Sequence, residues 1–211
     1  MTDISVKFKW DSVIVLDDWI STNKYKCKVY FDIETENGED QNVAFERCKV
    51  FIDLILADSL LININSPLLQ TLSKKTKQKI ITLPNEPLDI VLAAVIYNKF
   101  NTICESRLIV NKVEISSRQG DDICIHFDHE FNQSFNQLDN EMFNQLNETP
   151  WWFRADASYG DWFEQTKKEI KFHKHVGDWQ KELQWETVKD DSKEKISKWK
   201  PEIIHGGKTQ H

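Results

Sequence analysis

The sequence is poor in the features that define fibrous, membrane-spanning and nucleotide-binding chains. Only 6 glycines and 5 prolines occur among 211 residues, which argues against a fibrous or wholly disordered chain. The longest apolar run falls far short of the roughly 20 residues that a membrane helix needs, and no secretory signal is visible at the start. The glycines form no P-loop or dinucleotide fingerprint, and there is no nucleophile elbow. We therefore expect a soluble protein with no membrane partner and no cofactor.

The cysteines show no spacing typical of a metal site or a redox motif. Such motifs need two thiolates brought together by a short loop, and no C-x-x-C pair occurs. Each cysteine lies in an apolar or strand-like stretch, so we expect buried free thiols in a reducing cytoplasm. The four residues are Cys27, Cys48, Cys104 and Cys124. His126 and His129 would point to opposite faces of a strand. We interpret both as solvated side chains, and we expect no metal site.

Acidic side chains outnumber basic ones by 34 to 27, which gives a formal net charge of −7. Binding to duplex DNA depends on Lys and Arg neutralising phosphates, so this balance disfavours nucleic acid as a partner. The charge is unevenly spread. Residues 1–150 carry 15 basic and 23 acidic side chains, whereas residues 151–211 carry 12 and 11. The last third of the chain would therefore approach an anionic partner more readily than the rest.

The apolar patterns predict a sheet combined with helices. Alternating or apolar runs rich in β-branched and aromatic residues predict strands, and apolar positions recurring at i+3 and i+4 predict helices. The expected strands are 5–15, 25–34, 79–83, 107–117 and 122–128, and the expected helices are 42–57, 66–77 and 86–104. Directly joined strands favour antiparallel hairpins, and strands separated by helices favour parallel crossovers. The predicted fold class is α+β, a mixed β-sheet with two main helices packed on one face, over residues 1–130.

The chain changes character after residue 130. Residues 131–150 are rich in Asn and Gln and repeat the triplet FNQ, which is typical of a linker with too little apolar area to fold alone. Residues 151–211 then carry six of the eight tryptophans. Burying six such side chains would contribute on the order of 20–35 kcal/mol before opposing terms. This segment must therefore cover much of its aromatic surface on its own domain, on a second copy of the chain or on a partner.

The leading hypothesis is a non-enzymatic interaction protein with an aromatic-rich C-terminal arm, residues 151–211. Aromatic side chains at such spacing suit a segment that docks them one by one into pockets of a partner. The arm would bind a protein partner or form a homo-oligomer with a second copy. Its expected anchors are Trp151, Trp152, Trp162, Trp179 and Trp185.

A second hypothesis is a metal-dependent 3'-5' exonuclease. The segment FDIE at 31–34 resembles the first motif of the DEDD-type exonucleases, in which two carboxylates on one strand face hold two divalent ions for phosphodiester hydrolysis. In that family a helix does not follow this motif directly, whereas here a polar loop and a helix are expected. The resemblance implies a catalytic set of Asp32, Glu34, Asp128, His173 and Asp178, with Mg²⁺ or Mn²⁺ as the cofactor.

Several other stretches resemble an uncharacterised conserved protein of T4-like bacteriophages of marine bacteria, the cyanophages and their relatives. The matching segments are FKWDSVIVLDDWISTNKYK (8–26), NVAFER (42–47), TLPNEPLDIVLAAVIYNKFNTICESRLIVNKVEISSRQGDD (82–122) and the Pro150-Trp151-Trp152 junction. The resemblance lies mainly over residues 8–122 and includes no catalytic signature. It implies a phage-encoded protein that acts in the host cytoplasm or is assembled into the virion. A virion component whose copies pack through the arm is therefore a third hypothesis.

Overall fold

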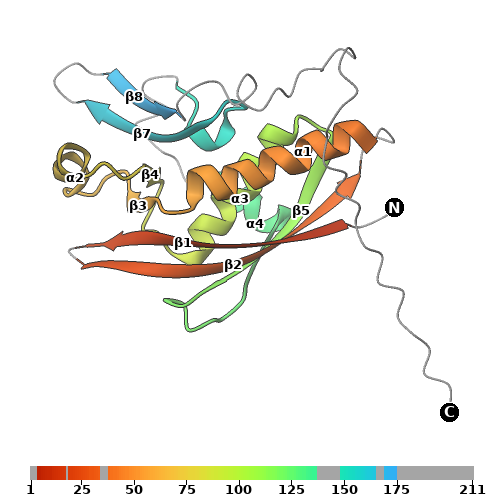
Figure 1. Cartoon of the computed structure of the whole chain (residues 1–211), viewed down its shortest axis with the longest axis horizontal. Coiled ribbons are helices and arrows are strands. Elements are labelled where there is room, and N and C mark those ends of the chain that lie inside the picture. Colours follow the sequence, from red (N-terminus) through yellow and green to blue (C-terminus); the bar gives the residue numbers. More distant parts are fainter. Residues whose placement is uncertain (1–3, 18, 34–37, 137–147, 165–168, 175–211) are drawn as a thin grey trace, which may run out of the picture.

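The computed structural model describes residues 4–17, 19–33, 38–136, 148–164 and 169–174. Six strands form one sheet in the order β4-β3-β1-β2-β5-β6, and β7 and β8 form a second, two-stranded sheet (Figure 1). The strands are β1 (Ile4–Leu16), β2 (Trp19–Ile33), β3 (Leu60–Asn63), β4 (Ile80–Leu83), β5 (Leu108–Ser117), β6 (Ile125–Asp128), β7 (Ser158–Glu164) and β8 (Glu169–Lys174). The α-helices are α1 (Gly38–Val50), α2 (Leu69–Lys75), α3 (Asp89–Cys104) and α4 (His129–Asn136), with a π-helical turn η1 (Phe51–Leu56) and a 3-10 turn η2 (Trp151–Phe153).

The six-stranded sheet is mixed because its strands are joined in two ways. The hairpins β1-β2 and β5-β6 are antiparallel, and β2 also pairs antiparallel with β5. The strands β3 and β4 each follow a helical crossover. Strand β3 pairs in parallel with β1, and β4 pairs in parallel with β3. Joined strands can form a tight antiparallel pair, whereas a parallel pair needs a long crossover. The predicted α+β class with a mixed sheet is confirmed.

The two faces of this sheet are covered differently. Alternate residues of β1, β2 and β5 enter one hydrophobic core together with residues of α1 and α3, as the alternation of side chains along a strand requires. A smaller cluster lies where Val15, Leu60, Ile62 and Ile80 meet Leu69 of α2. The two main helices therefore lie on one face, as predicted, and α2 covers the β3-β4 end of the other face.

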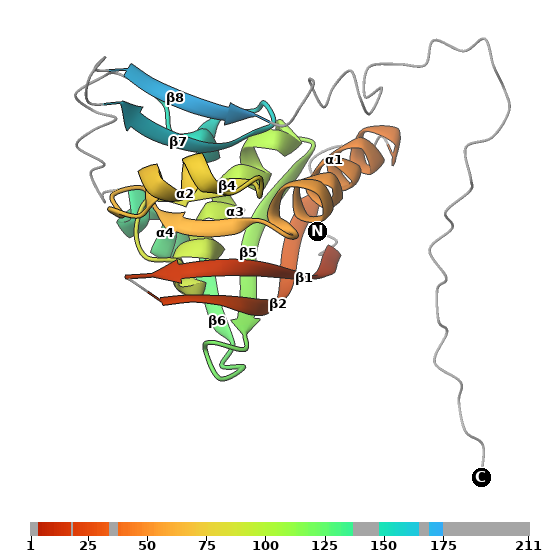
Figure 2. The same ribbon diagram turned by 60° about the vertical axis from the view of Figure 1, so that its left-hand side comes forward.

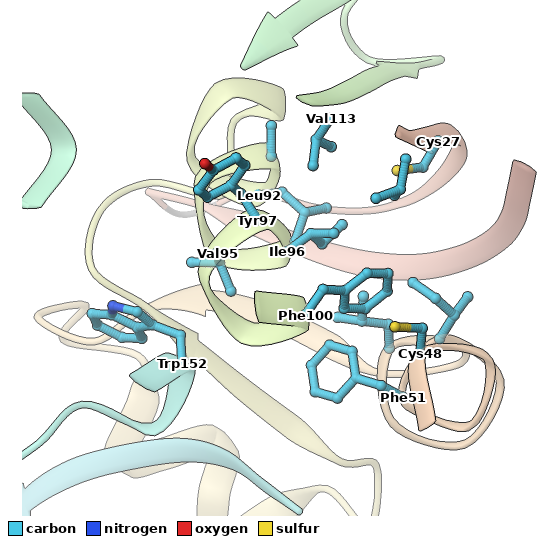
Figure 3. Packing of buried hydrophobic residues seen from close by; sticks show 14 of the residues in the cluster. Cys27, Cys48, Phe51, Leu92, Val95, Ile96, Tyr97, Phe100, Val113 and Trp152 are labelled. Atoms are coloured by element: carbon cyan, nitrogen blue, oxygen red, sulfur yellow. The ribbon is translucent and has the colours of Figure 1, made fainter. Parts of the chain in front are cut away.

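The contact of α1 and the following turn η1 with α3 centres on fully buried side chains. The Phe51 and Phe100 rings meet edge to face with centroids 6.1 Å apart, and Phe100 meets Phe8 of β1 in the same way at 5.8 Å. Figure 3 shows Cys48 and Phe51 beside Phe100. Such edge-to-face aromatic pairs contribute about 0.5–1.5 kcal/mol each beyond the burial of their area. This cluster ties η1 and α3 to the long β1-β2 hairpin.

Several details differ from the sequence prediction. The strand β3 was not expected, and α4 occupies the first part of the predicted linker 131–150. The core also continues past the predicted domain end at residue 130, because it includes Trp151, Trp152 and Tyr159. Three cysteines are buried as expected, but Cys124 is exposed, so that prediction is wrong at this residue. Within the described residues, every helix is too short or too polar to cross a membrane.

We predict that Phe100→Ala destabilises the fold strongly, because it leaves a cavity between Phe8 and Phe51 at a fully buried position. The free energy of unfolding in urea should fall by about 3–5 kcal/mol. The matched control is Phe131→Ala, since that ring is 57% exposed and its removal should change stability by less than about 1 kcal/mol. Equal losses in the two variants would contradict the assignment of Phe100 to the core.

Candidate functional site

The first part of the predicted arm packs into the domain that precedes it. In η2, Trp151 is fully buried and Trp152 is 3% exposed. The Trp151 ring stacks on Phe51 with centroids 6.0 Å apart, and its Nε1 donates to the carbonyl oxygen of Thr82 in β4 at 2.7 Å. Figure 3 shows Trp152 on the side of α3 from which Val95 projects. Both indole rings are therefore parts of the core.

Trp151 and Trp152 are thus wrong as predicted anchors for an external partner. The sequence shows how much aromatic surface a segment carries, but not which surface covers it. The chain's own domain is covalently linked to these tryptophans and is therefore present at a high effective concentration. It competes for their rings better than a second molecule does. For these two residues, the domain covers the rings, and almost no ring surface remains exposed for a partner to contact.

Lys99 binds the backbone of residues 151–156 through three hydrogen bonds. The residue lies in α3, and its side chain is fully buried. Its ammonium group donates to the carbonyl oxygens of Trp151 at 3.0 Å, Arg154 at 2.7 Å and Asp156 at 2.8 Å. A lysine ammonium has three donors, and all three are used. Because a buried charge is costly unless it is hydrogen-bonded, Lys99 fixes the backbone path of residues 151–156.

Asp161 completes the attachment at the start of the second sheet. Its carboxylate accepts the Trp151 backbone N–H at 2.9 Å and Arg154 Nη1 at 2.8 Å, and its own N–H donates to Thr82 Oγ1 at 2.7 Å. Burial raises the pKa of Asp161 to about 6, although Arg154 and the Trp151 N–H act in the opposite direction. Thr82 therefore binds both ends of the segment, through its carbonyl oxygen and its hydroxyl.

We call Thr82, Lys99, Trp151, Arg154 and Asp161 the tail anchor. These residues lie in β4, α3, η2 and β7, with Arg154 directly after η2, and they use hydrogen bonds and one ion pair rather than apolar contact alone. Their arrangement positions a chain segment and offers no nucleophile beside a general base. The tail anchor therefore defines a fixed point from which the chain continues after Asp161.

Sequence reasoning missed Lys99, Thr82 and Asp161. The signal for Lys99 is present, since a single lysine stands within the apolar run of the 86–104 helix. A lysine at a position surrounded by core residues must find buried acceptors. Its acceptors come from residues more than 50 positions away, and the sequence does not indicate which they are.

The other three tryptophans expected to contact a partner are Trp162, Trp179 and Trp185. Trp162 lies in β7, where it pairs with Lys171 of β8, and Trp179 and Trp185 fall outside the described residues.

The structure does not bring together those predicted exonuclease residues that it describes. Asp32 on β2 accepts a hydrogen bond from Asn111 Nδ2 at 3.0 Å. Asp128 ends β6, where its Oδ1 accepts the backbone N–H groups of Glu130 and Phe131 and caps α4. Strand β5 lies between β2 and β6, which separates the two residues by about two strand spacings, or roughly 10 Å. Ions about 3.5–4 Å apart need closer carboxylates.

The third described exonuclease residue, His173, lies near neither Asp32 nor Asp128. His173 lies on β8, whose partner β7 contacts β4, at the opposite edge of the large sheet from β6. Figure 2 shows β7 and β8 at one end of the molecule and β6 at the other. Glu34 and Asp178 fall outside the described residues. Asp32, Asp128 and His173 therefore belong to three separate places in the fold.

One group of potential metal ligands does come together within the described residues. Ligand atoms of Glu114, Cys124 and His126 all lie within 4.8 Å of one another on β5, β6 and the turn between them. His126 is exposed, as expected for a solvated side chain, and the exposed Cys124 lies beside it. His129 takes no part, since its ring contacts Gln133 at 3.2 Å.

Comparison with known proteins gives no functional assignment. No family model matches the chain, and no curated protein matches it. An uncharacterized protein from Wolinella succinogenes, known from its crystal structure, matches with a TM-score of 0.45 and 14% sequence identity. The match covers 61% of this chain and 98% of the Wolinella chain. Similarity at this level carries no information on function.

We predict that Lys99→Met destabilises the protein by about 3–5 kcal/mol, because the carbonyl oxygens of Trp151, Arg154 and Asp156 lose a charged donor. Urea denaturation of the full-length chain measures this loss. The control is Lys9→Met, at an exposed position on the outer face of β1, which should change the free energy of unfolding by less than about 0.5 kcal/mol. Wild-type stability in Lys99→Met would show that the three hydrogen bonds do not hold the segment.

We also predict a specific pH dependence from Asp161. The pKa is raised from its ordinary 3.8 to about 6 in the folded state, so between these values the folded protein keeps a proton that the unfolded chain loses. The stability that Asp161 contributes is complete below pH 4 and is lost as the pH rises through 6. The loss amounts to about 3 kcal/mol.

The isosteric variant Asp161→Asn isolates this effect, because every other titrating group is shared with the wild type. Urea denaturation at several pH values measures the difference in unfolding free energy between the two proteins. The wild type should lose stability relative to Asp161→Asn as the pH rises from 4 to 6, and the difference should then level off. A difference that stays constant over this range would contradict the raised pKa.

Proposed function

We propose that the protein is a non-enzymatic interaction protein whose C-terminal segment binds a protein partner or a second copy of the chain. The globular domain, including residues 151–161, is the base of this segment. The partner contacts come from the tryptophans that follow it, among them Trp162, Trp179 and Trp185. Trp151 and Trp152 serve the base and not the partner.

The tail anchor is the observation that carries this proposal. Three hydrogen bonds from the buried Lys99 ammonium attach the start of the segment to α3. Two hydrogen bonds with Thr82 attach it to β4, and the Arg154–Asp161 ion pair at 2.8 Å closes the segment on itself. A segment that leaves a rigid base loses less freedom on binding than one that leaves a flexible linker, and this lowers the cost of association. Such attachment suits a segment that must be presented in a defined place.

The composition of the chain beyond the anchor supports the same proposal. Residues 175–211 contain Trp179, Trp185 and Trp199. Tryptophan is among the residues most enriched where truncation costs the most binding energy. The resemblance to proteins of T4-like phages adds the setting that we propose for the interaction, the cytoplasm of an infected bacterium. If the partner is another copy of the chain, the protein can also be a component of the virion.

We predict that a chain ending at Lys174 folds as the full chain does but loses the interaction. This truncation keeps all the described strands and helices, including the tail anchor. Light scattering after size-exclusion chromatography measures the oligomeric state, and affinity capture from infected cells with mass spectrometry identifies protein partners. The full chain should form an oligomer or retain a partner that the truncated chain does not.

Substitutions in the full chain separate this effect from folding. Trp179→Ala combined with Trp185→Ala should reproduce the loss of binding without changing the unfolding transition. Trp19→Ala is the matched control, because Trp19 is 51% exposed at the β1-β2 hairpin. If the full chain, the truncated chain and both variants share one oligomeric state and capture the same proteins, the proposal is wrong.

A further inference from the structure

The outer face of the β5-β6 hairpin gathers three side chains of different chemistry. Val113 and Ile115 of β5 are buried, so Glu114 between them points to the opposite, outer face. His126 is the direct cross-strand neighbour of Glu114. Such paired residues on one face are the closest that a sheet provides. Cys124 lies two residues before His126, immediately ahead of β6, and its side chain is exposed.

These three side chains already lie near the geometry of a shared ion. Their ligand atoms are within 4.8 Å of one another, and His126 Nδ1 is 3.3 Å from Glu114 Oε1. Zinc binds sulfur at about 2.3 Å and nitrogen or oxygen at about 2.0–2.2 Å, so tetrahedral ligands lie roughly 3.3–3.8 Å apart. A contraction of about 1 Å brings the set together. Two of the three side chains are exposed and can rotate to make it.

We propose that Glu114, Cys124 and His126 form a binding site for a divalent transition-metal ion of the zinc type. A thiolate, an imidazole and a carboxylate together favour such an ion over Mg²⁺ or Ca²⁺, which take oxygen ligands. Three protein ligands leave a fourth position open to water. The site lies at the β6 edge of the large sheet, far from the tail anchor at the β4 edge, and it does not depend on the proposed interaction.

Neighbouring residues hold the carboxylate of Glu114 in place. Tyr30 Oη donates to Glu114 Oε2 at 2.9 Å, and Lys28 Nζ donates to Tyr30 Oη at 2.7 Å. Hydrogen bonds of this kind orient a ligand and tune its strength. They occupy Oε2, so the ion would bind through Oε1. Tyr30 is therefore a positioning residue for the site.

Lys112 opposes metal binding at the same carboxylate. Its Nζ lies 2.7 Å from Glu114 Oε1, the atom that faces His126. An ion must displace this ammonium and then bind beside its positive charge. Because of this competition, we expect removal of the Lys112 charge to increase the affinity of the site for the metal ion. An adventitious ion on Cys124 alone would respond much less to residue 112.

Titration of the reduced, full-length protein with Co²⁺ tests the proposal. We expect one equivalent to produce a thiolate-to-cobalt charge-transfer band and the visible bands of a four-coordinate ion, and Zn²⁺ to abolish both. Cys124→Ser should lose the charge-transfer band, and Glu114→Gln and His126→Ala should weaken binding by at least about tenfold. Lys112→Met should tighten it several-fold. Circular dichroism confirms that each variant is folded.

His129→Ala is the matched control, because this exposed histidine is three residues from His126 and outside the site. It should bind Co²⁺ as the wild type does. Because the other three cysteines are buried, the charge-transfer band reports Cys124. The proposal is overturned if the wild type shows no such band, if Cys124→Ser keeps it, or if Glu114→Gln and His126→Ala bind with wild-type affinity.

Discussion

A buried ammonium group must find three acceptors, and this constraint fixes the C-terminal part of the fold. Lys99 stands where the apolar face of α3 meets the core, so water cannot solvate it. Its three acceptors are backbone carbonyls of Trp151, Arg154 and Asp156. With that path set, Trp151 stacks on Phe51 and reaches Thr82, and Asp161 pairs with Arg154. Removing the segment would therefore leave both an unpaired charge and an open core, which is why the domain does not end at residue 130.

The tail anchor and the group of Glu114, Cys124 and His126 lie at opposite edges of the large sheet. Different interactions form them. At the β4 edge, hydrogen bonds from Lys99 and with Thr82 join chain segments distant in sequence, and burial makes those that water cannot reach costly to break. At the β6 edge, Glu114, Cys124 and His126 are partly or fully exposed and follow from the pairing of two adjacent strands. The large sheet holds the two edges apart, so a change at one need not disturb the other.

Much of the architecture could be predicted from the sequence, because its elements have clear periods. The helix at 86–104 and the strands at 5–15 and 107–117 carry long apolar patterns, and each is present within three residues, whereas the strand predicted at 25–34 begins six residues earlier, at Trp19. The strand β3 was missed because LLIN has only three apolar residues in a row, too few to show a period. The sites depend on pairing between distant segments. The C-x-H spacing of Cys124 and His126 was visible, but the third ligand is known only once the register places Glu114 opposite His126.

Residues 151–161 belong to the cooperative fold of the domain, because Lys99, Thr82 and Phe51 hold them in the core. Native-state hydrogen exchange tests this most directly, since the N–H groups of Trp151 and Asp161 are both donated to buried oxygens. These amides should exchange only through global unfolding, with the same opening free energy as the amides in the middle of α3. Exchange through a local opening, at a free energy several kcal/mol below that of α3, would contradict the account.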